Sequence, residues 1–221
     1  MFNNWDDLDY WDSGEWQVVQ EKLDTMEKNH ETYCPPRELL FSAMDACEFS
    51  SCRVAIFGQD PYPNLQDATG IAFSVGKSTR GIPPTLNAIF DELVADLKVP
   101  RPKTGDLSQW CSQGVLLWNV IPSCAEGKSL SHENWIEWEY LTQEITRRLG
   151  EKGIVFVFLG GRARDYAPMV RDLQNCRVLE TSHPSPRASR KSKNPFIGSR
   201  LFSTINAKLV ELKQEPIDWR L

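Results

Sequence analysis

Four short apolar runs, each ending abruptly in polar or glycine residues, constrain the fold of this 221-residue chain more than any other feature. They cover residues 53–58, 114–119, 153–160 and 176–182. The first three show little polar/apolar alternation, which is typical of strands buried on both faces of a sheet. Segments with helical periodicity lie between them, at residues 85–97 and 134–149. This alternation predicts an α/β fold, in which helices flank both faces of a central, four-stranded, mostly parallel sheet.

We expect a single domain over residues 1–221, because no low-complexity linker divides the chain. The first 50 residues are predicted to form helices outside the sheet, and residues 1–10 a flexible acidic segment. The net charge of −5 argues against a uniformly basic coat for nucleic acid, but the charge is unevenly distributed. Residues 1–32 hold nine acidic and two basic residues, whereas residues 187–200 hold five basic residues and no acidic one.

Several classes of protein are excluded by what the sequence lacks. No apolar run approaches the roughly 20 residues of a membrane-spanning helix. The N-terminus is acidic and aromatic, unlike a secretory signal, which predicts a cytoplasmic rather than a secreted protein. The six cysteines show no CxxC or metal-ligand spacing, so we expect reduced, mostly buried thiols and no metal site.

Polar residues follow each of the four predicted strands. Asp60 comes after the first strand, Asn119 ends the second, a glycine pair at 160–161 follows the third, and His183 follows the fourth. Alone, each residue has an ordinary explanation as a turn, loop or surface residue. Because the carboxyl ends of parallel strands meet at one edge, where ligands bind, their equivalent positions instead favour one shared site.

The groups at this edge restrict the chemistry. The sequence has no nucleophile elbow, no Walker loop and no GxGxxG after a strand. What remains is an Asp that can hold a water, a His that can donate to a developing anion, and an Asn amide with one donor and one acceptor. Tyr62 and Phe73, by default core residues, can sandwich a planar heterocycle. This set suits hydrolysis of a bond between a pyrimidine base and a sugar.

The motifs that carry these residues resemble family 1 uracil-DNA glycosylase. They are residues 58–62 (GQDPY), 70–75 (GIAFSV), 114–119 (GVLLWN) and 183–186 (HPSP). The resemblance continues at residues 33–36, 82–85, 105–108 and 216–219, in the order and spacing of the family. It covers roughly residues 11–219 and is far more specific than any single motif.

The resemblance implies a DNA repair enzyme that flips uracil out of DNA and hydrolyses its N-glycosidic bond, leaving an abasic site. It implies that Asp60 positions and activates the attacking water, and that His183 hydrogen-bonds uracil O2 as negative charge builds there. Gln59 would add a backbone contact to the base. No cofactor or metal is implied. DNA is the implied partner; a protein inhibitor or replication partner is left open, and we expect a monomer.

The same resemblance assigns the walls of the uracil site. Asn119 would read uracil N3–H and O4, which cytosine presents with donor and acceptor exchanged. Phe73 would stack on the flipped base. Tyr62 would stand against C5 and exclude the methyl group of thymine.

The chain departs from the family pattern at several positions. Pro63 and Thr69 stand where the family has His, the first of which belongs to the water network near the catalytic Asp. Arg187 replaces the apolar wedge, a Leu, that follows the HPSP motif. An Arg can still fill the gap left by a flipped base, because its guanidinium stacks on bases and attracts phosphates. A solvated loop without this role is the ordinary alternative.

The family also grips the DNA backbone with small hydroxyl residues. Thr85 and Ser185 keep such a hydroxyl, whereas Gly161 and Ala188 do not. We expect basic side chains of the loop to compensate, and the predicted DNA contacts in it are Arg187, Arg190, Lys191 and Lys193. Two alternatives remain at this point: the same chemistry on a 5-substituted uracil, and a catalytically weakened DNA-binding subunit.

Overall fold

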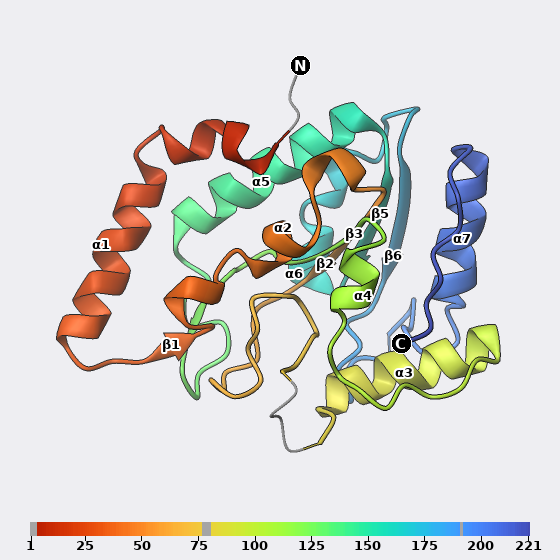
Figure 1. The fold of residues 1–221 in the computed structure, drawn as a ribbon, viewed down its shortest axis with the longest axis horizontal. Helices are drawn as coiled ribbons and strands as arrows, with labels where there is room; N and C mark the ends of the chain where they lie inside the picture. The colour runs from red at the N-terminus through yellow and green to blue at the C-terminus, as the bar shows by residue number, and fades with distance from the viewer. Residues whose placement is uncertain (1–3, 77–80, 191) are drawn as a thin grey trace.

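A four-stranded parallel sheet forms the centre of the protein (Figure 1). The structure is a computed structural model that describes residues 4–76, 81–190 and 192–221. The strands β2 (Val54–Gly58), β3 (Val115–Asn119), β5 (Val155–Leu159) and β6 (Arg177–Thr181) lie in the order β3-β2-β5-β6. Each neighbouring pair is parallel, so the α/β fold and the four predicted strands are confirmed.

Helices cover both faces of the sheet, with α1 and α5 together on one side and α3 and α7 together on the other (Figure 1). The predicted helices begin and end within about three residues of the observed ones. The bounds are α1 (Glu15–Lys28), α2 (Ser42–Ala46), α3 (Pro84–Leu97), α4 (Ser108–Cys111), α5 (Ile136–Lys152), α6 (Gly161–Arg164) and α7 (Leu201–Glu211). Short 3-10 turns lie at Trp5–Asp7, Asp9–Trp11, Arg37–Leu39, Phe49–Ser51 and Ala167–Met169.

The unbroken apolar character of the strands follows from their position. Every residue of β2, β3 and β5 is buried, whereas β6, at the edge, is buried only at Thr181. Phe57 stacks between strands against Phe158, with 5.1 Å between ring centroids. Strands that bury both faces need no polar side, which explains their lack of alternation.

Residues 4–10 differ from the expected flexible segment. Trp5 and Leu8 are buried in the core, and the Trp5 indole donates to the Cys47 carbonyl at 2.7 Å. The backbone N–H groups of Asp9 and Tyr10 donate to the two carboxylate oxygens of Glu144 on α5. Apolar residues set among the acids therefore anchor this segment, which corrects the prediction over its described part.

A second, two-stranded sheet is not predicted by any pattern in the sequence. It pairs β1 (Tyr33–Cys34) with β4 (Cys124–Ala125) in antiparallel register. All six cysteines are buried free thiols, in agreement with the sequence. Within the described ranges, no helix has the length and apolar character needed to cross a membrane.

Two buried carboxylates join α3 to the segment that leads into α7. Glu92 accepts hydrogen bonds from the backbone N–H groups of Gly198 at 2.6 Å and Arg200 at 2.7 Å. Asp96 accepts from the backbone and the hydroxyl of Ser203, at 2.8 and 2.6 Å. The bonds to Arg200 and Ser203 satisfy N–H groups at the start of α7, and together with the bond to Gly198 they hold the end of the basic loop, residues 187–200, against α3.

Candidate active site

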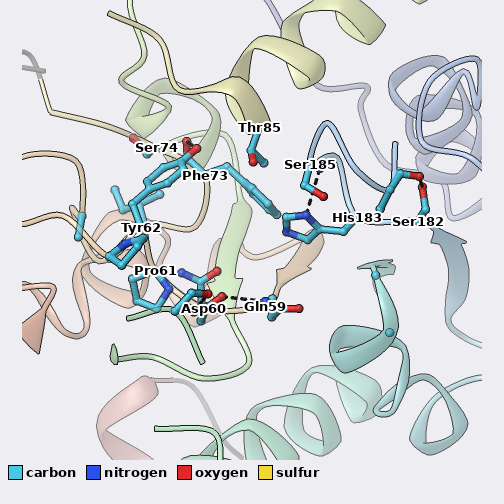
Figure 2. Close-up of a pocket in the computed structure, with 18 of the residues that line it drawn as sticks. Gln59, Asp60, Pro61, Tyr62, Phe73, Ser74, Thr85, Ser182, His183 and Ser185 are labelled. Carbon is cyan, nitrogen blue, oxygen red and sulfur yellow. Dashed lines mark hydrogen bonds between the residues drawn. The ribbon is translucent and has the colours of Figure 1, made fainter. Parts of the chain in front are cut away.

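A pocket of about 550 Å³ opens beyond the carboxyl ends of the central strands (Figure 2). The chain passes from β2 to β3 on one side and returns to β5 on the other, so the pocket lies where the strand order reverses. Eight of the predicted site residues line it: Gln59, Asp60, Tyr62, Phe73, Thr85, Asn119, His183 and Ser185. These eight residues come from the ends of β2, β3 and β6 and from the start of α3, and Gly160 and Gly161, after β5, complete the lining.

Asp60 is held by three donors on its carboxylate. Its Oδ1 accepts from the side-chain amide of Gln59 at 3.0 Å. Its Oδ2 accepts from the hydroxyl of Ser129 at 2.6 Å and from the backbone N–H of Leu130 at 2.7 Å. Charge-assisted hydrogen bonds of this kind restrict the carboxylate to one orientation.

His183 is a neutral imidazole with a defined tautomer. Burial lowers its pKa from 6.5 to about 4, and the charge of Asp60 opposes that shift only in part. Its Nδ1 accepts from the backbone N–H of Ser185 at 3.1 Å (Figure 2). Because Nδ1 is an acceptor, the ring proton is on Nε2, which makes Nε2 a hydrogen-bond donor at neutral pH.

Gly160 lets the His183 ring sit this close to β5. Its φ of +98° is a conformation that side chains rarely adopt, and a Cβ there would lie 2.9 Å from the Cβ of His183. A glycine at position 160, directly after β5, is therefore required both by the turn and by the close packing against His183.

Phe73 and Asn119 form the inner wall of the pocket, and both are almost fully buried. The Phe73 ring lies 6.0 Å from the His183 ring, centroid to centroid, and its backbone has a φ of +67°. A left-handed conformation in a bulky residue is uncommon and tends to occur at functional sites. The hydroxyl of Tyr62 donates to the Phe73 carbonyl at 3.1 Å, which fixes the two aromatic residues relative to each other.

Gly58, the last residue of β2, lies directly behind this wall. A Cβ at this position would lie 2.7 Å from Oδ1 of Asn119 and 2.8 Å from Cζ of Phe73. Only a residue without a side chain lets the amide and the ring approach the strand so closely.

The predicted DNA contacts lie in two groups. Thr85, in the first turn of α3, and Ser185 line the pocket. Arg187, Arg190 and Lys193 are exposed and lie outside its lining. Lys191 falls outside the described residues.

The basic loop is tied at its base to Ser182, beside His183. The Ser182 hydroxyl donates to the Ala188 carbonyl and accepts from the Phe196 N–H, each at 3.0 Å. The Ser182 N–H donates to the Asn194 carbonyl at 2.8 Å. Both ends of the loop, at residue 188 and at residues 194–196, are thus hydrogen-bonded to Ser182, the residue next to His183.

Sequence reasoning missed several lining residues. Ser129 lies 69 positions from the carboxylate that it contacts, and no motif marks it. Arg164 on α6 also lines the pocket and donates from Nε to the Gly160 carbonyl at 3.3 Å. A basic residue one turn after the predicted glycine pair was the only available signal for Arg164.

Fold and site together define a class of protein. A hydrogen-bonded carboxylate and a neutral imidazole with a free N–H meet an amide and an aromatic ring at the edge of a parallel sheet. This arrangement suits a planar heterocyclic base and hydrolysis of its bond to a sugar.

Comparison with known proteins identifies the family. The family model described as "Uracil DNA glycosylase superfamily" matches residues 44–210, and the chain belongs to this superfamily. A uracil-DNA glycosylase of Campylobacter jejuni (strain RM1221) is 36% identical over 207 residues, which cover 93% of this chain and 86% of that protein. The Campylobacter fetus uracil-DNA glycosylase is 40% identical over 196 residues, covering 88% and 81% of the two chains.

Solved structures agree with this assignment. Mimivirus uracil-DNA glycosylase superimposes with a TM-score of 0.86 at 26% identity, covering 96% of this chain and 85% of that one. A mimivirus UNG variant in complex with UGI superimposes with a TM-score of 0.85 at 26% identity, covering 96% and 87%.

Proposed function

We propose that this chain hydrolyses the N-glycosidic bond between uracil and deoxyribose in DNA, releasing uracil and leaving an abasic site. The observation that carries the proposal is the pairing of the fixed Asp60 carboxylate with the neutral His183 donor in one pocket. The name of the relatives and the matching family model support it. Within the superfamily we assign the chain to family 1, on its motifs at residues 58–62 and 183–186.

The proposed reaction uses each group once. A water on Asp60 attacks C1′ of the sugar while the bond from C1′ to N1 of uracil breaks. The bonding electrons leave with the base, and Nε2–H of His183 donates to O2, where the negative charge collects. The proton of the water goes to Asp60. Donors fixed in advance stabilise charge that is present only in the transition state, which accelerates the chemical step.

The pocket lies within the protein, so a base in duplex DNA must leave the stack to reach it, and we propose that the nucleotide is flipped. Asn119 reads the N3–H and O4 edge of uracil, Phe73 stacks on the ring, and Tyr62 stands against C5. The tie between the Tyr62 hydroxyl and the Phe73 carbonyl supports this last role, because it keeps the phenol ring from swinging aside.

A uracil-release assay tests the function. Oligonucleotides with one uracil, single- and double-stranded, are incubated with wild type and with Asp60→Asn, and abasic sites are cleaved and counted on a gel. We expect release by wild type and loss of most of that rate in Asp60→Asn. No release by wild type, so that Asp60→Asn is merely as inactive as wild type, would favour a DNA-binding subunit instead. The same assay with 5-hydroxymethyluracil and thymine tests the alternative base, which Tyr62 is expected to exclude.

For DNA binding we propose that the exposed cations of the 187–200 loop supply contacts that Gly161 and Ala188 lack. Arg187 takes the position of the family wedge. Because each neutralised phosphate releases counterions, affinity should fall more steeply with salt for wild type than for Arg187→Leu. Equal slopes in a salt titration of binding would contradict this role. A single domain, a monomeric state and an unidentified protein partner remain predictions.

A further inference from the structure

The loop between β4 and α5 lies against the segment that follows β2. It folds on itself, since the Ala125 N–H donates to the Ser131 hydroxyl at 2.6 Å. Its Gly127 N–H donates to the Pro63 carbonyl at 2.8 Å. The Ser129 hydroxyl and the Leu130 N–H then donate to Oδ2 of Asp60. The β4–α5 loop thus binds the segment that follows β2 at two places, the Asp60 carboxylate and the Pro63 carbonyl.

The two carboxylate oxygens of Asp60 differ in how many hydrogen bonds they already accept. An ionised carboxylate has about four acceptor positions. Two donors from the loop take both positions on Oδ2, and the Gln59 amide takes one on Oδ1. The remaining acceptor position belongs to Oδ1, so a water that donates to this carboxylate does so there. By occupying Oδ2, the hydroxyl of Ser129 helps to determine that a water binds at Oδ1.

The backbone of the loop is shaped for this contact. Leu130 has a φ of +61°, a left-handed conformation that non-glycine residues seldom adopt, and its N–H is the one that donates to Oδ2. Such a conformation is retained where the surroundings require it, and often at functional sites.

Pro63 explains why a donor from another loop is needed. A proline has no N–H and no polar side chain, so position 63 can offer the carboxylate no hydrogen bond. The Ser129 hydroxyl instead reaches Oδ2 at 2.6 Å from a loop distant in sequence.

From these contacts we propose that Ser129 is a positioning residue: its hydroxyl fixes Oδ2 of Asp60 so that Oδ1 presents the attacking water to the sugar. This inference rests on the proposed uracil excision. Ser129 acts through Asp60 and donates no proton to the substrate.

Single-turnover uracil release and DNA binding, measured on Ser129→Ala, test this role. Loss of one hydrogen bond to a charged group should slow release roughly tenfold or more, with DNA affinity unchanged. Ser129→Thr keeps the hydroxyl and should restore the rate to within about threefold.

A double-mutant cycle separates positioning from loop folding. If Ser129 acts only through Asp60, the double variant Ser129→Ala, Asp60→Asn should be no slower than Asp60→Asn alone. Additive losses would overturn the proposal. Ser131→Ala is the matched control, since it removes a loop hydrogen bond that does not involve Asp60. A loss in Ser131→Ala equal to that in Ser129→Ala would assign the effect to folding of the loop, and would also overturn it.

If wild type releases no uracil, the proposed function is wrong. If wild type releases uracil in a reaction that needs Asp60 while Ser129→Ala matches wild type, only the role of Ser129 is wrong.

Discussion

The substitution Gly58→Ala should displace Asn119 and Phe73, the two residues of the inner pocket wall. The new Cβ would lie 2.7 Å from Oδ1 of Asn119 and 2.8 Å from Cζ of Phe73. Comfortable contacts between such atoms begin at about 3.5 Å, so the amide must retreat by about 0.8 Å and the ring by about 0.7 Å. The backbone of Gly58 is not in the left-handed region, so alanine brings no backbone strain of its own.

Both the stability and the rate should fall, by different amounts. Overpacking a close-packed interior costs about 1–3 kcal/mol, from which the reduced freedom of the unfolded chain recovers up to about 1 kcal/mol. Misplacing a substrate-binding group by nearly 1 Å can cost about 10²-fold in rate. We therefore expect kcat/KM for uracil release from Gly58→Ala to fall by roughly 10²-fold, while urea unfolding shows a loss of about 1–2 kcal/mol.

Gly161→Ala is the matched control for this prediction. It makes the same substitution at the start of α6, where the new Cβ meets nothing within 4 Å and φ is not left-handed. Its rate should stay within about twofold of wild type, because the methyl group displaces no neighbour. A folded Gly58→Ala protein that releases uracil within about threefold of the wild-type rate would refute the reasoning, since the amide and the ring would then not need their present positions.

Three further predictions concern the base-reading amide, pH and the α3–α7 contact. Asn119→Asp places an acceptor against uracil O4, and gel assays at pH 8 should show uracil release at least about 10²-fold slower. Burial lowers the pKa of both His132 and His183 from 6.5 to about 4, so the unfolded chain binds more protons as pH falls below 6.5. The free energy of unfolding should then drop by up to about 1.4 kcal/mol per pH unit per histidine between pH 6.5 and 5, and a urea series on His132→Asn should show a smaller slope. Glu92→Ala leaves two backbone N–H groups without acceptors and should cost about 2–3 kcal/mol in urea unfolding, whereas an unchanged midpoint would contradict the role of this contact.

The sheet was predictable because its strands are short, apolar and sharply ended. Such runs bury both faces, and their polar ends mark one edge of the sheet. This logic placed Asp60, Asn119 and His183 at one edge without knowledge of the loops. The aromatic roles required the family resemblance, since Phe73 and Tyr62 have the pattern of ordinary core residues.

Contacts set by the path of a loop were out of reach. Ser129 meets Asp60 only because the loop before α5 packs against the segment that follows β2, and no periodicity in the sequence predicts that path. Trp5 and Leu8 stand among acidic residues, a composition typical of a flexible segment, yet they reach the core while Glu144 binds the neighbouring backbone. Two-residue strands such as β1 and β4 are too short for any repeating pattern.

The ring of hydrogen bonds around Ser182 makes the basic loop a replaceable module. These hydrogen bonds fix both ends of the loop next to His183. Residues between the two ends can therefore be inserted, or their charge changed, without moving the imidazole. Lengthening a loop whose ends are already joined adds little to its closure entropy. The DNA contacts proposed for this loop can therefore change independently of the residues around His183, and a loop from a relative can be grafted between the same two anchor points.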